Sequence, residues 1–121
     1  MPDITEITDE SFGAAVLRAD KPVLVDFHAP WSRACHLLDP VLQQLADEYG
    51  DALQIAKVDV EQNRQTTMAF DVLATPTLIL FIDGRPITRI VGAYGHAQLL
   101  AELESSFTGR DRSPAVAAPQ A

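Results

Sequence analysis

The feature that most limits the fold of this chain is an alternation of short strand-like runs with a helical repeat. Val23 to Phe27 (VLVDF) and Thr77 to Ile82 (TLILFI) are mostly apolar and have the length of buried strands. Between them, five residues recur at the spacing of an amphipathic helix: Leu38, Val41, Leu42, Leu45 and Tyr49. Strands that alternate with helices predict an α/β domain in which helical crossovers join parallel strands.

Weaker segments extend the same alternation in both directions. Further strands are expected in residues 4–7 and 53–60, and further helices near residues 9–20, 63–70 and 96–107. Thr8 or Asp9 can cap the first of these helices. Asp83–Gly84 predicts a tight hairpin, so Pro86–Val91 should return as an antiparallel edge strand that tolerates its proline. The predicted order is β-α-β-α-β-α-β-β-α, a mixed central sheet with helices on both faces.

Length and composition limit the chain to one domain. With 121 residues, of which 47% are hydrophobic, it has enough material for a single core and too little for two. The last predicted helix ends near Phe107, before Gly109. Residues 108–121 contain charges, then proline and alanine without periodicity, and predict a disordered C-terminal tail after a domain of residues 1–107.

Charge and hydropathy exclude several classes of partner. A net charge of -8 repels phosphate backbones, so no nucleic-acid partner is expected. The longest apolar runs are far shorter than the roughly 20 residues that span a bilayer, so no membrane partner is expected either. The N-terminal segment lacks the pattern of a secretory signal, and one cysteine cannot form an internal disulfide. These observations favour a soluble, cytoplasmic monomer.

The most informative motif is W-S-R-A-C, residues 31–35, between the VLVDF strand and the amphipathic helix. Backbone N–H groups and the dipole at a helix N-terminus favour a negative charge, including a thiolate. In a C-x-x-C redox motif the attacking cysteine would stand at position 32, where this chain has Ser32. Cys35, the only cysteine, stands at the second position.

From Ile4 to Phe107 the chain resembles the thioredoxin family. The resemblance rests on VLVDF, on Trp31 and Cys35, on KVDV with Lys57, on ATPT around Pro76, on the DG turn, and on VGAY with Gly92. It implies the thioredoxin fold and the activity of a thiol-disulfide oxidoreductase that reduces protein disulfides. It also implies two partners, protein substrates with disulfides or extended peptide segments and a thioredoxin reductase, with no bound cofactor.

By the same resemblance, Asp26 is the candidate general base for Cys35, with Lys57 as its buried partner. A carboxylate within an apolar strand is costly unless it is paired, so Asp26 needs an explanation in any case. The alternative is that Asp26 and Lys57 form a purely structural buried pair.

The resemblance also implies a peptide-binding groove beside a cis Thr75–Pro76 bond, which without it would be an ordinary turn proline. The substrate-binding residues that it implies are Trp31, Arg33, Ala34, Ala74, Thr75, Pro76, Gly92 and Ala93. Trp31 could instead belong to the core.

Departures from the family pattern affect the predicted activity. Ser32 cannot form a disulfide, so the dithiol cycle is blocked as the chain is written, and Ser32 is instead a good helix N-cap. The chain is then an engineered Cys-to-Ser variant or a natural one-thiol relative. The alternative is a non-catalytic peptide- or protein-binding module, or a holdase chaperone, that uses the same groove. A one-thiol glutaredoxin-like enzyme does not fit this chain, because such enzymes keep the first cysteine of the motif and lose the second, the reverse of what is seen here.

Two further points concern the histidines. His28 stands where the family has an aromatic residue, and a lone histidine near a core is more often packed than functional. With one cysteine and scattered histidines, no metal site is expected.

Overall fold

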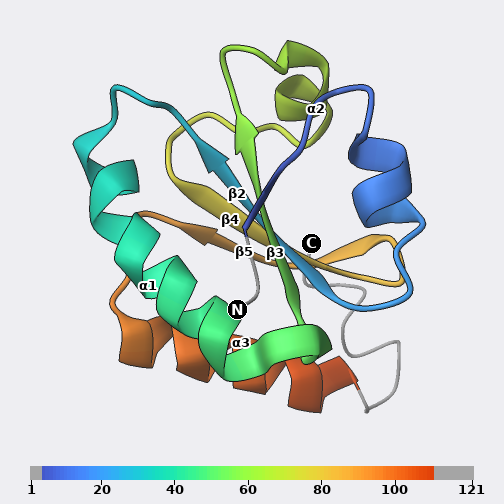
Figure 1. Ribbon diagram of the computed structural model, residues 1–121, viewed down its shortest axis with the longest axis vertical. Helices are drawn as coiled ribbons and strands as arrows, with labels where there is room; N and C mark the ends of the chain where they lie inside the picture. The colour runs from blue at the N-terminus through green and yellow to red at the C-terminus, as the bar shows by residue number, and fades with distance from the viewer. Residues whose placement is uncertain (1–3, 111–121) are drawn as a thin grey trace.

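The β-branched and aromatic run after Pro22 forms β2 (Val23–His28), the middle strand of a five-stranded sheet (Figure 1). The structure, a computed structural model, describes residues 4–110. The strand order is β1-β3-β2-β4-β5. The other strands are β1 (Thr5–Glu6), β3 (Gln54–Asp59), β4 (Thr77–Ile82) and β5 (Arg85–Val91). The predicted order of elements and the mixed sheet are confirmed.

Strand direction differs from the prediction at one crossover. β1 and β2 run parallel to β3, but β4 runs antiparallel to β2 and β5 runs antiparallel to β4. Between β3 and β4 the chain passes through α2 (Arg64–Ala69), which at 6 residues is about 9 Å long. It then re-enters the sheet at the end where β3 leaves it, so β4 runs in the direction opposite to β2 (Figure 1).

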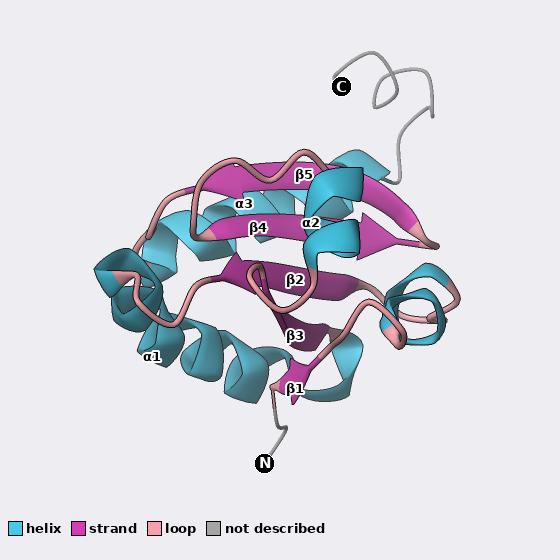
Figure 2. Ribbon diagram, turned by 90° about the horizontal axis from the view of Figure 1, so that it is seen from above, coloured by secondary structure: helices cyan, strands magenta, loops and turns pink. Residues whose placement is uncertain are grey.

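Helices cover both faces of the sheet, as predicted (Figures 1 and 2). They are η1 (Gly13–Leu17), a π-helical turn, α1 (Arg33–Tyr49), η2 (Gly50–Ala52), α2, and α3 (His96–Arg110). Leu38 and Leu42 of α1 and Leu99 of α3 share one core cluster with Leu24 of β2. Val25 packs in the second cluster with residues from η1 and the segment after α2. Because alternate residues of β2 point to opposite faces, Asp26 lies on the α1 side.

The predicted cap and hairpin turn are present, and of the two candidate cap residues, Thr8 caps the first turn while Asp9 has a different role. Thr8 caps the first turn, since its Oγ1 accepts a hydrogen bond from the Ser11 N–H at 3.2 Å. Asp9 instead reaches α2, where its carboxylate accepts hydrogen bonds from the Thr66 N–H at 2.9 Å and Oγ1 at 2.6 Å. Asp83 and Gly84 both have positive φ, 54° and 77°, as the predicted hairpin requires.

The last helix is longer than predicted. α3 continues through Gly109 to Arg110, beyond the end expected near Phe107, so residues 108–110 are helical rather than part of the tail. Packing of the Leu99 and Leu103 side chains against the core holds this helix in place, and a glycine tolerates a helical position at modest cost. The rest of the predicted tail, residues 111–121, lies outside the described residues. Within the described part, no helix is long and apolar enough to cross a membrane.

Candidate functional site

The turn between β2 and α1 presents the W-S-R-A-C motif at the carboxyl end of β2. Trp31 is 70% exposed, whereas Ser32 is buried. The Ser32 Oγ accepts a hydrogen bond from the Cys35 N–H at 3.3 Å, which makes Ser32 the N-cap of α1. Arg33 is exposed and Ala34 is partly buried in the first turn of the helix. Serine at position 32 therefore stabilises the helix start.

Cys35 is a free thiol and only 3% exposed. It lies one turn inside α1, on the side of the helix that packs against the sheet. A thiol in this position meets reagents from solvent only when the surrounding structure opens.

Asp26 is fully buried on the α1 face of β2, and neither carboxylate oxygen has a hydrogen-bond partner within residues 4–110. Burial raises the pKa of Asp26 from 3.8 to about 7; the Lys57 charge opposes this rise, while Asp39 and Glu6 add to it. A buried acid that titrates near neutral pH can take up or release a proton under ordinary conditions.

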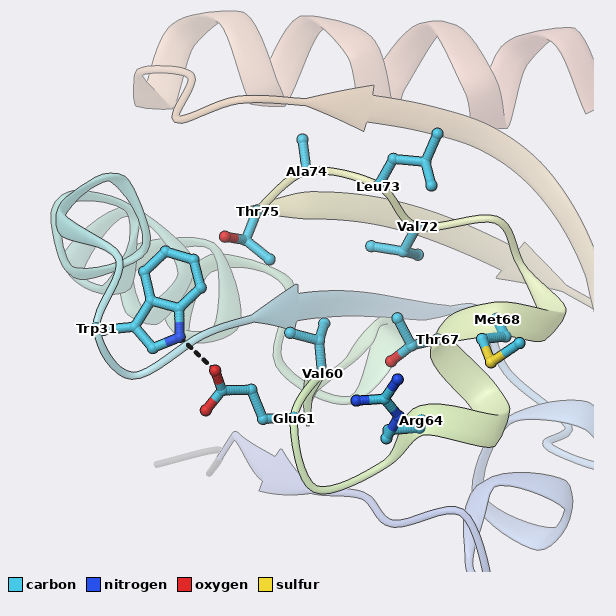
Figure 3. A pocket seen from close by; sticks show the side chains of 10 residues that line it. All are labelled: Trp31, Val60, Glu61, Arg64, Thr67, Met68, Val72, Leu73, Ala74 and Thr75. Carbon is cyan, nitrogen blue, oxygen red and sulfur yellow. Dashed lines mark hydrogen bonds between the residues drawn. The ribbon is translucent and has the colours of Figure 1, made fainter.

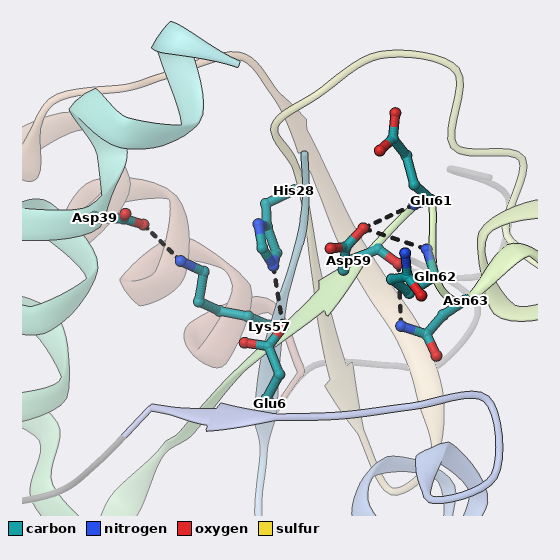
Figure 4. Close-up of polar contacts among 8 residues, drawn as sticks. All are labelled: Glu6, His28, Asp39, Lys57, Asp59, Glu61, Gln62 and Asn63. Atoms are coloured by element: carbon teal, nitrogen blue, oxygen red, sulfur yellow. Dashed lines mark hydrogen bonds and ion pairs between the residues drawn. The ribbon is translucent and has the colours of Figure 1, made fainter. Parts of the chain in front are cut away.

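Lys57 is not the direct partner of Asp26 that the sequence suggested. The two residues are opposite one another in the register of β2 and β3, but the Lys57 Nζ donates a hydrogen bond to the Asp39 Oδ1 of α1 at 2.9 Å (Figure 4). Burial lowers the pKa of Lys57, but the Asp39 hydrogen bond and charge, with Asp26 and Glu6, raise it above 10.5. Lys57 thus acts on Asp26 through its charge rather than through a hydrogen bond.

His28 ends β2 and is held by Glu6 of β1. Its Nε2 lies 3.1 Å from the Glu6 Oε2, a contact that joins two strands which both pair with β3 (Figure 4). The His28 side chain is 12% exposed. The structure therefore gives this histidine a packed, paired position.

The Thr75–Pro76 peptide bond is cis, as the resemblance implied. The Pro76 carbonyl accepts a hydrogen bond from the Gly92 N–H at 2.9 Å, which holds the end of β5 beside this loop. The Ala74 carbonyl accepts one from the Thr77 Oγ1 at 2.6 Å. The backbone N–H and carbonyl of Thr75 make no hydrogen bond with the described residues. An extended peptide could pair with these free groups.

An open pocket of about 320 Å³ lies between the cis-proline loop and α2 (Figure 3). Its lining residues are Trp31, Val60, Glu61, Arg64, Thr67, Met68, Val72, Leu73, Ala74 and Thr75. The Trp31 Nε1 donates a hydrogen bond to the Glu61 Oε2 at 2.7 Å, which fixes the indole at one end of the pocket. Of the predicted groove residues, Trp31, Ala74 and Thr75 line this pocket, while Arg33, Ala34, Pro76, Gly92 and Ala93 do not.

Sequence reasoning missed the residues that follow β3. Glu61 and Arg64 reach the pocket because parallel strands β2 and β3 end at the same edge of the sheet, so the segments after them meet. That rule, applied to the polar residues after each predicted strand, would have found both. It would not have found Asp39, because its contact with Lys57 depends on how α1 packs across the sheet.

No group of three or more histidine, cysteine, aspartate or glutamate side chains within the described chain could hold a metal ion. A mixed sheet, a helix that begins at a W-x-x-x-C turn, and a neighbouring cis-proline loop together define the class of thioredoxin-fold proteins.

Comparison with known proteins agrees with this class. The family model described as thioredoxin matches residues 3–105, and the chain belongs to the thioredoxin family. A thioredoxin of Mycobacterium tuberculosis (strain ATCC 25618 / H37Rv) is 51% identical over 98 residues, covering 81% of this chain and 84% of that protein. A thioredoxin of Mycolicibacterium smegmatis is 51% identical over 103 residues, 84% of this chain and 92% of the relative. A bifunctional thioredoxin reductase/thioredoxin of Mycobacterium leprae is 49% identical over 98 residues, 81% of this chain and 21% of the relative.

Proposed function

We propose that this chain has the site of a protein disulfide reductase in which the dithiol cycle cannot close, because Ser32 stands in place of the attacking thiol. The observation that carries the proposal is Asp26, which is fully buried, has no hydrogen-bond partner among the described residues, and has a pKa raised by burial to about 7. A scaffold used only for binding has no need of such a costly acid, whereas thiol chemistry at Cys35 does.

The chemistry of the cycle defines each role. In a dithiol reductase, a thiolate at position 32 attacks a substrate disulfide and forms a mixed disulfide, releasing one substrate thiolate. The Cys35 thiol then loses its proton to a base, for which Asp26 is the proposed group, and attacks the mixed disulfide. This step forms the 32–35 disulfide and releases the second substrate thiolate. Ser32 cannot form a disulfide with the substrate, so neither step occurs.

Insulin reduction with dithiothreitol as the electron source tests the proposal. The chain as given should show no turnover above its Cys35→Ser variant. Ser32→Cys should restore turnover, because position 32 already lies at the N-terminus of α1, where a thiolate is stabilised. Adding Asp26→Ala to Ser32→Cys should slow it. An inactive Ser32→Cys variant that nevertheless forms the 32–35 disulfide would contradict the proposal.

A second candidate is a peptide- or protein-binding module, or a holdase, that uses the same groove without redox turnover. Its support is the Thr75 backbone, which makes no hydrogen bond with the described residues and lines the same pocket as the exposed Trp31. Under this reading the chain as given binds unstructured peptides that contain no cysteine, and Trp31→Ala weakens that binding. Fluorescence polarisation with labelled peptides measures it.

The proposed partners follow from the same chemistry. Protein substrates with disulfides or extended segments would dock through the groove formed near Trp31 and Thr75, together with Arg33, Ala34, Ala74, Pro76, Gly92 and Ala93. A thioredoxin reductase is the proposed electron donor for the Ser32→Cys form, and the bifunctional thioredoxin reductase/thioredoxin of Mycobacterium leprae supports this pairing. We place the protein in the cytoplasm as a monomer without a bound cofactor, since a reducing compartment keeps Cys35 as a thiol.

A further inference from the structure

Among the described residues, one cationic side chain at the pocket beside Trp31 has no partner. Arg64 is the only arginine or lysine among the residues that line the pocket. Arg64 is exposed, and its side chain makes no hydrogen bond or ion pair with any described residue. By contrast, Lys57 is bound to Asp39, and the Arg89 guanidinium donates to the Phe70 carbonyl. The Arg64 charge is therefore available to a ligand.

The carboxylate nearest in sequence does not neutralise Arg64. Glu61 also lines the pocket, but one of its oxygens accepts the hydrogen bond of the Trp31 indole at 2.7 Å, and no ion pair within 4.0 Å joins it to Arg64. Figure 3 shows Glu61 directed toward Trp31 and Arg64 placed further along the same wall. This wall thus carries a carboxylate with one hydrogen-bonded oxygen at one end and, at the other, a guanidinium that has no partner among the described residues.

The opposite wall and the end of the pocket are apolar and face solvent. Leu73 is 95% exposed and Met68 is 71% exposed, while Val72, which lines the same pocket, is buried (Figure 3). Large aliphatic side chains with this exposure, gathered at one pocket, indicate a surface that is covered when a ligand binds. A single apolar side chain of a ligand would fit against Leu73 and Met68 within reach of Arg64.

We infer that the groove selects an extended segment of a partner protein that carries a large apolar side chain and, close to it, an aspartate or glutamate, with Arg64 as the residue that determines the preference for the carboxylate. This inference rests on the peptide groove of the proposed function. Guanidinium groups pair with carboxylates in a planar, two-bonded geometry, so a carboxylate is the side chain that best complements a free arginine.

The expected size of the preference for an acidic peptide depends on how exposed the ion pair between Arg64 and the ligand carboxylate would be. The net charge of -8 repels an acidic ligand at long range, so Arg64 acts only through direct contact. Exposed ion pairs are weak, and partial cover by the apolar ligand side chain strengthens this one. We expect an acidic peptide to bind about fivefold more tightly than its neutral counterpart at low salt. The preference should shrink as salt is added.

Fluorescence polarisation with pairs of labelled peptides tests the inference. Each pair has one phenylalanine in a polar background without cysteine, and differs only in glutamate against glutamine at a fixed distance from the phenylalanine. Binding is measured to the chain with its own sequence and to its variants Arg64→Gln, Arg64→Lys, Leu73→Ser and Trp31→Ala. Arg85→Gln is the matched control, because Arg85 is an exposed arginine at the hairpin end of β5, outside the pocket.

The inference expects Arg64→Gln to remove the preference for glutamate, Arg64→Lys to keep part of it, and Arg85→Gln to keep all of it. Leu73→Ser should weaken both peptides of a pair equally. If the glutamate preference is absent, or is unchanged in Arg64→Gln, while Trp31→Ala still weakens binding, the inference is overturned and the peptide groove stands. If no peptide binds, or if the chain instead occupies the groove with a second copy as judged by sedimentation, both fail.

Discussion

Asp26 and Lys57 lie directly opposite one another on β2 and β3, yet the Lys57 ammonium donates its hydrogen bond to Asp39 on the helix above. The two carboxyl groups near the Lys57 ammonium are therefore not equivalent, because only Asp39 receives its hydrogen bond. Asp39 is satisfied, while the fully buried Asp26 has no hydrogen bond within the described residues and a pKa near 7. This arrangement costs stability when Asp26 is ionised, and it leaves that carboxyl group ready to exchange a proton near neutral pH.

The first prediction is that Asp26→Ala stabilises the protein above neutral pH. In the unfolded chain the carboxyl titrates near 3.8, and in the folded chain near 7. As pH rises from about 4 to 7, the unfolded state loses its proton first, so the free energy of unfolding falls, by about 4 kcal/mol in all. Asp26→Ala removes this loss and leaves a small cavity, so we expect a gain of roughly 2 kcal/mol at pH 8.

Urea denaturation at several pH values measures this effect. The gain from Asp26→Ala should shrink steadily as pH falls from 7 to 4, below which both states of the parent chain are protonated. Asp51→Ala, at an exposed carboxylate of η2, serves as the control and should leave the pH profile nearly unchanged. A gain that is the same at pH 4 and pH 8 would mean that ionised Asp26 carries no cost.

The second prediction concerns the charges around Asp26. Asp39→Asn removes a negative charge that raises the Asp26 pKa and that competes for the Lys57 ammonium, so the Asp26 pKa should fall. Lys57→Met removes the charge that lowers it, so the pKa should rise above about 7. NMR titration of the Asp26 carboxyl carbon measures both shifts. Glu48→Gln, near His96 and away from this cluster, is the control, and shifts of the same sign in both variants would refute the charge assignment.

The third prediction is that Cys35 reacts slowly with thiol reagents in the native protein. With 3% of its surface exposed, its thiol is reached only through an opening of the structure. Labelling should accelerate by orders of magnitude in denaturant. Equal labelling rates in native and unfolded protein would show an accessible thiol and would favour a one-thiol role for Cys35.

The fourth prediction compares two glycines with positive φ. A Cβ at Gly84 would lie 2.5 Å from the Leu17 carbonyl oxygen, whereas a Cβ at Gly50 would meet nothing within 4 Å. Gly50 has φ 55° and ψ -129°, outside the left-handed helical region, so Gly50→Ala should cost about 2 kcal/mol of unfolding free energy from backbone strain alone. Gly84→Ala should cost more, about 3 kcal/mol, because the hairpin must also move away from η1. Thermal denaturation of the two variants gives the comparison, and equal losses would mean that the contact with Leu17 is easily relieved.

Much of the fold could be predicted from local patterns. Val23–His28 and Thr77–Ile82 are strands because their residues suit a buried pleated surface, and α1 forms because Leu38, Leu42 and Leu45 recur on one face. The Asp83–Gly84 hairpin follows from the freedom of these residues to adopt positive φ. In each case the decisive interactions lie within a few residues of one another along the chain.

The sequence by itself determined the order of elements, Ser32 as the cap of α1, and the presence of a buried acid at Asp26. Tertiary structure alone decided that β4 runs against β2, that Lys57 binds Asp39, and that Arg64 lines the same pocket as Trp31 without a partner among the described residues. The physical reason is the distance along the chain over which the deciding interactions act. Propensity, caps and turns act between near neighbours, whereas these contacts depend on how α1 and α2 are seated on the sheet, which is set by the packing of the whole core.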